Sequence, residues 1–260
     1  MVGINIECSE NEILLSQSGF ANQVVDHFEK KASITILMNK TTLPKWKLET
    51  SKNKLINQNW YQSIIGSLIY MPLGTRPDIS FAVNYLARYS TSPQEEHWQA
   101  SRHLLGYIEY SINQTMKYWI TGKKLEVWTD ADWGGEFQCS TTGFVFKLFG
   151  CTVAWASRRQ TLVATSTCAA ELVAMGMITD LLSFILQILE STKEKIPATL
   201  ICDNKAAVMI LEGSKTRIKS LERPFYSVND LIRNEWISTT NQLAEVCTKR
   251  LGPTKHSCKL

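Results

Sequence analysis

The stretch "WTDADWGG", residues 128–135, places two carboxylates, Asp130 and Asp132, at the end of an otherwise apolar run. Aspartate and glycine are common turn formers, so one interpretation is simply a strand that ends in a turn. The alternative interpretation is that one of the two carboxylates binds a metal ion. The choice depends on whether acidic residues elsewhere in the chain have positions that bring them to the same place.

The composition limits the classes of protein to which the chain can belong. The 260 residues are 44% hydrophobic and 20% charged with a net charge of +4, which is typical of a soluble globular protein and permits a polyanionic partner without requiring one. The 7 cysteines include no CxxC pair, which argues against a disulfide framework or a zinc site and indicates a reducing, intracellular setting, cytoplasmic or nuclear. No uninterrupted apolar run reaches membrane-spanning length. We therefore expect no membrane partner and no disulfide partner.

The first half of the chain is predicted to be mainly helical. Short strands are expected over 2–7 and 12–16, and an exposed connection is expected over 40–58. One helix has strong start signals, with Ser92 as N-cap, Pro93 at the first helical position and Glu95 completing a capping box. The predicted helices cover 19–31, 60–71, 76–90 and 92–112.

The pattern changes at about Leu125. Three strands are predicted, with Gly150 as a tight connection between the second and the third, and a helix, a buried strand and a short helix follow. This order indicates a mixed α/β domain with helices packed on a central sheet. The predicted strands cover 125–130, 142–149, 151–159 and 198–203, and the predicted helices cover 167–190 and 204–213.

Three acids occupy notable places in these elements. Glu171 begins an otherwise apolar helical stripe, where a carboxylate is costly to desolvate unless something pairs with it. The alternative is that the helix dipole stabilises it. Asp203 and Asp130 each end a strand, and each has the alternative of being a cap or turn residue. The apolar members of the stripe are Met175, Ile178, Leu182 and Ile185.

Taken together, the order of these acids resembles the ribonuclease H fold, with an Asp on the first strand, a hairpin, a Glu early in the first helix and an Asp ending the fourth strand. The similarity is closer to the ribonuclease H domain of Ty1/copia-type retrotransposon polyproteins. The family's "SDADWAG", "STSGYVF", "ISWSSKKQ", "CDNQAAI" and "QLADILTKPL" are matched by "TDADWGG", "STTGFVF", "VAWASRRQ", "CDNKAAV" and "QLAEVCTKRL". The family's "SSTEAEYIA" is matched more loosely by "TSTCAAELVA".

The resemblance implies an α/β fold class, a ribonuclease H-like mixed sheet with flanking helices, preceded by a smaller, mainly helical connection segment. It implies three parts. Residues 1–124 would be the end of a reverse transcriptase, after the palm, plus the connection; 125–252 would be the ribonuclease H-like domain; and 253–260 would be a tail. No "YxDD" motif occurs, so no polymerase activity is expected.

The resemblance also implies a reaction, the metal-dependent hydrolysis of the RNA strand of RNA–DNA hybrids without sequence specificity. Two Mg²⁺ ions, replaceable by Mn²⁺, are expected. Asp132 matches a structural or supporting acid. Arg158 and Arg159 are candidate phosphate contacts, with the alternative that they are solvated surface charges. The expected metal ligands are Asp130, Glu171, Asp203 and Glu245, the last of which stands where the family has Asp.

Several departures from the family pattern leave other functions open. Ala169 replaces the family's first Glu of "TEAE", and "IKSLERPFYS" after residue 217 lacks both histidines and the acid of the family's "KHID…YHF". The stretch between Phe225 and Trp236 is a few residues short, which is expected to clip the fifth strand. The alternatives are therefore a catalytically inactive relic that still folds, and an accessory module that binds nucleic acid without cutting it.

Overall fold

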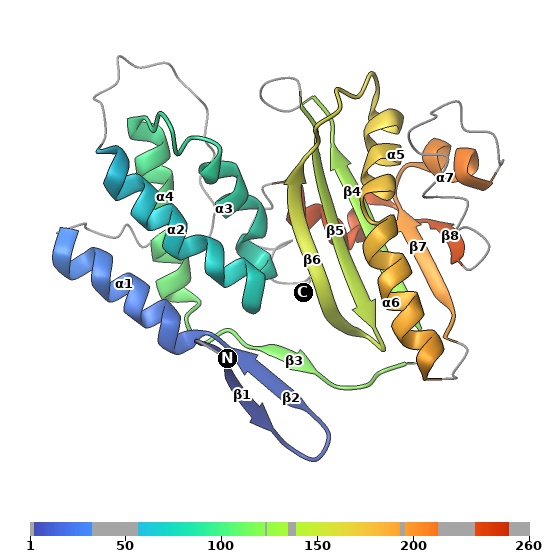
Figure 1. Ribbon diagram of the computed structural model, residues 1–260, viewed down its shortest axis with the longest axis horizontal. Helices are drawn as coiled ribbons and strands as arrows, with labels where there is room; N and C mark the ends of the chain where they lie inside the picture. The colour runs from blue at the N-terminus through green and yellow to red at the C-terminus, as the bar shows by residue number, and fades with distance from the viewer. Residues whose placement is uncertain are drawn as a thin grey trace. The chain divides into compact units, whose positions relative to one another are not determined.

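The computed structural model describes residues 3–32, 57–122, 124–134, 139–192, 196–212 and 232–249 (Figure 1). Two compact units divide these residues, one that ends at Tyr118 and one that runs from Trp119 to Lys249. The connection predicted over 40–58 lies almost wholly outside the described residues, and so does most of the divergent stretch after residue 217.

The N-terminal unit combines a small sheet with helices, as the sequence predicts. The antiparallel sheet has the order β1-β2-β3, and its third strand was not predicted. Apolar side chains from the helices form one core, which includes Phe28, Tyr61, Leu68 and Leu104. The elements are β1 (Asn5–Cys8), β2 (Ile13–Ser16), α1 (Ser18–Ala32), α2 (Gln58–Gly74), η1 (Pro77–Ile79), α3 (Ser80–Ala87), α4 (Glu95–Tyr110) and β3 (Met116–Tyr118).

Helix α4 begins later than predicted. Its N-cap is Gln94, whose side chain accepts from the His97 backbone while the Gln94 N–H donates to Nδ1 of His97 at 3.0 Å. The prediction of Ser92 and Glu95 as the capping box, with Pro93 as the first helical residue, is wrong. The Ser92 N–H instead bonds to the Tyr89 carbonyl at 3.1 Å, which closes a turn after α3.

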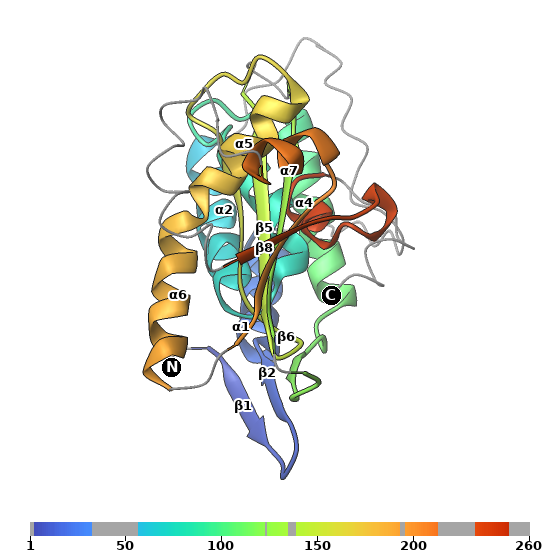
Figure 2. The same ribbon diagram turned by 90° about the vertical axis from the view of Figure 1, so that its right-hand side faces the viewer.

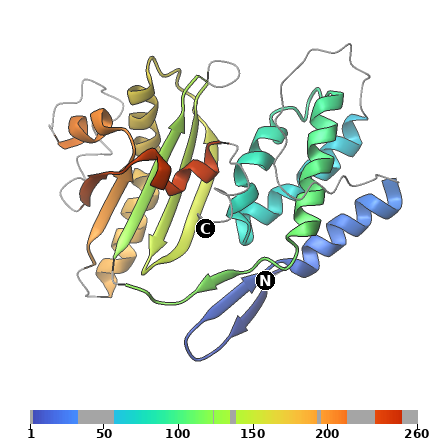
Figure 3. The ribbon, with the colours of Figure 1, turned by 180° about the vertical axis from the view of Figure 1, so that it is seen from behind.

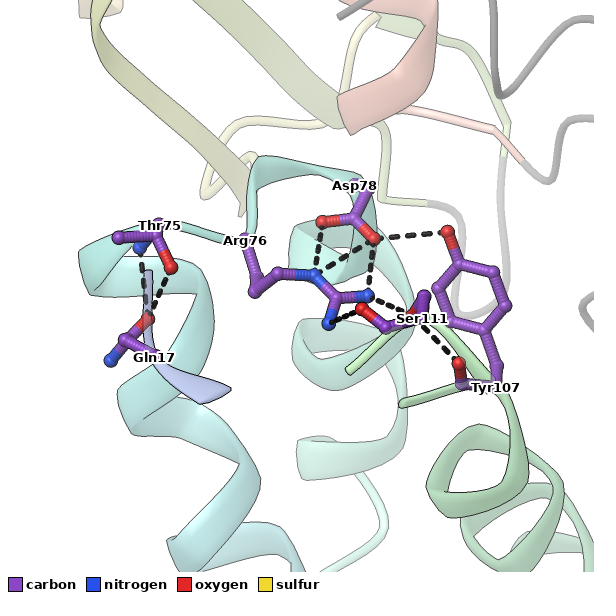
Figure 4. A network of polar contacts seen from close by, with 6 residues as sticks. All are labelled: Gln17, Thr75, Arg76, Asp78, Tyr107 and Ser111. Atoms are coloured by element: carbon purple, nitrogen blue, oxygen red, sulfur yellow. Dashed lines mark hydrogen bonds and ion pairs between the residues drawn. The ribbon is translucent and has the colours of Figure 1, made fainter. Parts of the chain in front are cut away.

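A buried polar network joins η1 and its N-cap Arg76 to the C-terminal end of α4 (Figure 4). The Arg76 guanidinium donates to both carboxylate oxygens of Asp78, with distances of 2.9 Å from Nε to Oδ1 and 2.7 Å from Nη2 to Oδ2. The Tyr107 hydroxyl donates to Oδ2 of Asp78 at 3.0 Å, and Nη2 of Arg76 reaches Oγ of Ser111 at 2.6 Å. Each charge is therefore paired and hydrogen-bonded, which offsets the free-energy cost of burying it.

The C-terminal unit is built on a five-stranded mixed sheet of order β6-β5-β4-β7-β8. Strand β4 pairs antiparallel with β5 and parallel with β7, while β5–β6 is antiparallel and β7–β8 is parallel. The β5–β6 hairpin turns through Phe149 and Gly150, both at positive φ as a two-residue hairpin requires. The strands are β4 (Leu125–Asp132), β5 (Thr141–Leu148), β6 (Cys151–Arg159), β7 (Ala198–Cys202) and β8 (Ile232–Trp236).

All five residues of β7 pair with β8, so the fifth strand is intact over the length of its neighbour. Helices α5 (Thr167–Met177), α6 (Thr179–Ser191) and α7 (Lys205–Glu212) also belong to this unit. Apolar residues of β4 and β5 pack with those of the three helices in one core. Figure 1 shows α5 and α6 covering one face of the sheet.

The single helix predicted over 167–190 is wrong in one detail, because it is interrupted at Ile178. The Thr179 hydroxyl donates to the Gly176 carbonyl at 2.8 Å, and such a side-chain bond competes with the helical N–H for that acceptor. Despite the break, the predicted stripe still faces the core, since Met175, Ile178 and Leu182 are all buried.

Within the described residues, one helical stretch, Thr167–Ser191, is long and apolar enough to cross a membrane by length and composition. The expectation that no segment reaches that length is wrong by this criterion, because Ser183 and Gln187 interrupt the apolar run without ending the helix. Of the 18-residue apolar window, 56% is buried within the protein. Packing against the sheet accounts for this apolar face.

The apolar spacing of "TTNQLAEVCTKRL", residues 239–251, predicts one helix capped by Thr240 or Asn241. The segment instead forms two 3-10 turns, η4 (Thr239–Asn241) and η5 (Leu243–Cys247). The cap is Gln242 rather than Thr240 or Asn241: its Oε1 accepts from Ala244 N, and its Nε2 donates to the Thr129 carbonyl at 2.8 Å. This double role holds the Gln242 backbone extended, which stops an α-helix from running through. Figures 2 and 3 show this segment on the sheet face opposite α5 and α6.

Gly143 lets η5 approach the sheet closely. A Cβ at this position would lie 2.6 Å from Cγ2 of Thr248 and 2.8 Å from the Ala244 carbonyl oxygen. We expect Gly143→Ala to lower the free energy of unfolding by about 1–3 kcal/mol, measured by urea unfolding, because backbone atoms must move. The control is Gly66→Ala in the middle of α2, where an added Cβ meets nothing within 4 Å. That change should stabilise by about 1 kcal/mol, and equal effects at the two positions would contradict the packing argument.

Candidate metal centre

Asp130 and Asp203 lie at the carboxyl ends of adjacent parallel strands. The pairing of β4 with β7 runs as far as Trp128 opposite Ile201. Two residues further along each strand, the same register brings Asp130 level with Asp203. Asp130 is 1% exposed, and Asp203 is half-buried. Ligands of open α/β sheets bind outside this edge.

Glu171 reaches the same edge from α5. Its carboxylate, the Cys202 thiol and the Asp203 carboxylate each offer an atom within 4.8 Å of the others. The Ala131 backbone and the Cys202 Sγ donate to the Glu171 carboxylate, the latter at 3.7 Å. Helix α5 thus brings a buried acid against the ends of β4 and β7.

Other residues cap the helices that Glu171 and Asp203 could otherwise have capped or stabilised. Ser166 caps α5, since its Oγ accepts from Ala169 N at 3.1 Å. Asn204 caps α7, since its Oδ1 accepts from Ala207 N at 3.1 Å. Glu171 is the fifth residue of α5, beyond the first turn where the helix dipole acts most strongly. Neither capping nor the dipole explains why these acids are here.

The fourth predicted acid, Glu245, approaches Asp130 through a shared lysine. Nζ of Lys249 lies 3.7 Å from Oδ2 of Asp130 and 4.0 Å from Oε1 of Glu245. The Thr248 hydroxyl donates to the same Asp130 oxygen. The structure therefore brings all four predicted acids, Asp130, Glu171, Asp203 and Glu245, to one edge of the sheet.

The pKa values report a crowded negative charge. Burial raises the pKa of Asp130, and the nearby charges of Asp203 and Glu245 raise it further, against the opposing effects of Lys249 and the Thr248 hydrogen bond. Burial raises the pKa of Glu171 to about 9, with contributions from Asp130 and Asp203. Burial acts to lower the pKa of Lys249, but the surrounding carboxylates raise it above the usual 10.5. One lysine does not balance this cluster.

The pKa of Glu171 predicts a pH dependence of stability. A carboxyl group with a pKa near 9 in the folded chain and about 4.3 in the unfolded chain binds its proton more tightly when folded. The contribution of Glu171 to stability is therefore fully present below about pH 4.3. It falls as pH rises towards 9, by at most about 1.4 kcal/mol per pH unit. Thermal melting in EDTA at pH 5, 7 and 9 measures this fall. Glu171→Gln should flatten it, and an unchanged slope in that variant would contradict the assignment.

The two candidate arginines point to opposite faces of the sheet. Arg159 pairs with Thr141, which pairs with Asp132, so these three side chains share the face that carries η5. Arg158 pairs with Thr142 and lies on the face that α5 covers. Both are exposed, and Nη2 of Arg159 lies 3.2 Å from Sγ of Cys139. Arg159 is therefore the better placed for a partner that crosses the Asp130 face.

Three residues of this site were not predicted, Cys202, Thr248 and Lys249. A signal for Lys249 was present, because it follows Glu245 by four residues, the spacing of helical ion pairs. Its contact with Asp130 joins parts of the chain far apart in sequence, so the spacing alone did not reveal it. Thr248 had no comparable signal.

The strand order and directions define the class. A hairpin flanks the first strand on one side, a parallel fourth strand lies on its other side, and helices cover one face, which is a ribonuclease H-like fold. The expected fold class is confirmed. A solved structure titled LC11-RNase H1, isolated from compost by a metagenomic approach, is similar with a TM-score of 0.39 and 17% identity, covering 48% of this chain and 93% of that one.

The relatives by sequence include several retrotransposon polyproteins. The Pol polyprotein from transposon TNT 1-94 of Nicotiana tabacum is 27% identical over 97% of this chain and 20% of its own length. That from transposon RE1 of Arabidopsis thaliana is 30% identical over 78% of this chain and 15% of its own length. No protein-family model matches the chain. The chain belongs to the Ty1/copia-type retrotransposon Pol polyproteins and spans about a fifth or less of the length of these relatives.

Proposed function

We propose that residues 125–252 hydrolyse the RNA strand of RNA–DNA hybrids in a metal-dependent reaction without sequence specificity. The observation that carries this proposal is the meeting of Asp130, Glu171 and Asp203 at one edge of the sheet, each from a different element. A buried acid whose pKa is raised by burial and by neighbouring acids, as that of Glu171 is, is typical of functional sites.

The donor set fits divalent magnesium. Mg²⁺ takes hard oxygen ligands, and the four carboxylates supply them in a cluster whose negative charge is not balanced by Lys249. Asp130, Glu171, Asp203 and Glu245 would hold two ions, for which Mn²⁺ can substitute. Such a pair, when bound, supplies an activated water and stabilises the leaving oxyanion. Burial raises the pKa of the Cys202 thiol, which remains a protonated donor to Glu171 and no ligand for a hard cation.

Substrate binding would rest on the phosphate backbone. Arg159, exposed on the face of Asp130, supplies a contact that neutralises phosphate without reading the bases. Residues 1–124 would be the end of a reverse transcriptase and its connection, adding further non-specific phosphate contacts. Binding of this kind weakens steeply as salt rises.

Cleavage of a 5′-labelled hybrid by the purified chain tests the proposal. We expect products with Mg²⁺ or Mn²⁺, none in EDTA, and none from single-stranded RNA, double-stranded RNA or duplex DNA of the same sequence. Fragments should appear along the whole RNA strand rather than at one site. Absence of any metal-dependent product would instead favour the inactive relic or the accessory nucleic-acid-binding module.

Glu245→Asp tests the fourth acid. Glu245 lies beside Lys249 in the cluster, so shortening its side chain by one methylene restores the acid that the family has and should preserve or raise cleavage, within about tenfold. The rate of hybrid cleavage at saturating Mg²⁺ measures the effect. Asp180→Asn, an exposed acid in the first turn of α6, is the control and should leave the rate unchanged. A Glu245→Asp rate far below wild type would show that Glu245 holds the metal in a geometry of its own.

A further inference from the structure

Two exposed tryptophans flank the acid cluster. Trp133 directly follows the end of β4 and is 48% exposed, and Trp236 ends β8 and is 50% exposed. In the sheet, β7 lies between β4 and β8, so Asp203 stands between the two indoles along this edge. Tryptophan is among the residues most thoroughly buried on average, so a half-exposed pair around one site calls for a reason.

Both indoles are held in place by their ring nitrogens. Nε1 of Trp133 donates to the Ala164 carbonyl at 2.9 Å, and Nε1 of Trp236 donates to the Asp203 carbonyl at 2.9 Å. The polar edge of each ring is thus satisfied by the backbone, which leaves apolar surface to face solvent. A side chain ordered in advance loses little entropy when a partner packs on it.

The two rings are spaced so that one partner can contact both. Trp236 pairs with Cys202 and is level with the acids, whereas Trp133 lies beyond Asp132 at the far end of β4. By strand spacing and rise, their Cα atoms are on the order of 15 Å apart. A nucleic-acid strand of several nucleotides that presents a phosphate to the acids is long enough to reach both rings. The minor groove of an A-form-like hybrid is wide and shallow and displays sugar edges.

We propose that Trp133 and Trp236 are paired platforms that pack against sugar rings of the RNA–DNA hybrid on either side of the cleaved phosphate. The inference rests on the proposed function for its choice of partner. These contacts are apolar, so they differ from the phosphate contact of Arg159 in one measurable respect. Loss of a phosphate contact lowers the dependence of affinity on salt, and loss of an apolar contact does not.

The test is the affinity of the full chain for a fluorescently labelled hybrid, measured by anisotropy in Ca²⁺ at several salt concentrations. We expect Trp133→Ala and Trp236→Ala each to weaken binding about tenfold, equivalent to about 1.4 kcal/mol, with the salt slope unchanged. Trp133→Phe and Trp236→Phe keep an apolar ring and should recover most of the affinity. Arg159→Gln should instead lower the salt slope.

The matched control is Trp119→Ala. Trp119 is also 48% exposed, but it lies beside Cys151 at the opposite end of the sheet, where the Cys151 thiol donates to its carbonyl. This variant should bind like wild type. If Trp133→Ala and Trp236→Ala also bind like wild type, or if the wild type does not bind hybrid, the platform inference is overturned. Weakened binding by both variants in a chain that never cleaves supports the platforms and overturns the nuclease alone.

Discussion

Replacing Asp130 by asparagine is expected to lower the rate of magnesium-dependent hybrid cleavage by about a thousandfold, equivalent to about 4 kcal/mol. Asparagine keeps the shape of the side chain and removes its charge, so the loss reports the missing metal ligand. Asp203→Asn should act similarly, because the two carboxylates occupy adjacent strand ends. Single-turnover cleavage of a labelled hybrid measures both rates.

The same substitutions should not destabilise the metal-free protein. Burial raises the pKa of Asp130, which means that its charged form is disfavoured in the fold. A neutral isostere is therefore expected to melt at the same or a higher temperature in EDTA, as is common where activity is traded against stability. Asp132→Asn, which alters an acid that we interpret as supporting, should lower the rate less than tenfold. Equal losses at Asp130 and Asp132, or a collapse of the melting temperature, would show that the rate loss has another cause.

The largest expected effect on stability is at Asp78. Asp78→Asn leaves the Arg76 guanidinium, whose side chain is 4% exposed, without a carboxylate partner. Removing one member of a buried ion pair costs about 3–5 kcal/mol, because the other charge stays buried and uncompensated. Arginine stays protonated in proteins, so Arg76 cannot relieve this loss by giving up its proton. Urea unfolding followed by far-UV circular dichroism measures the loss.

Two controls separate the charge from its surroundings. Tyr107→Phe removes one hydrogen bond to Asp78 and should cost only about 1 kcal/mol. Arg76→Met combined with Asp78→Leu removes both charges and should recover most of the stability that Asp78→Asn loses. A double variant as unstable as the single one would mean that the network acts through its shape rather than through its charges.

The parts of the fold that sequence reasoning predicted correctly are those governed by local pattern. The β5–β6 hairpin follows from two apolar runs around Gly150, and the face of α5 and α6 follows from apolar spacing. The errors arise where a local hydrogen bond competes with the predicted helix or cap. The Thr179 hydroxyl interrupts a helix that the apolar spacing would continue. Ser92 does not cap α4, and its backbone N–H instead closes a turn with the Tyr89 carbonyl.

The candidate site likewise contains residues that local pattern predicts and residues that it does not. Asp130 and Asp203 were predictable because each lies near the carboxyl end of an apolar strand, and adjacent parallel strands end at a common edge. The 3-10 form of Leu243–Cys247 was not, because it depends on Gln242 bonding to Thr129 across the sheet. The role of Lys249 depends in turn on that docking, since its partner Asp130 lies on the same distant strand.

The Gln242–Thr129 hydrogen bond, which spans 113 residues of sequence, has a consequence for the order in which the protein becomes functional as it is made. A ribosome releases β4, α5 and β7 well before η5, and domains begin to fold as their elements emerge. A growing chain can therefore assemble the edge with Asp130, Glu171 and Asp203 while Glu245 is still untranslated. Under the proposed function, cleavage that needs the fourth carboxylate would begin only after Lys249 has left the ribosome, so an unfinished chain would not yet cleave nucleic acids around the ribosome.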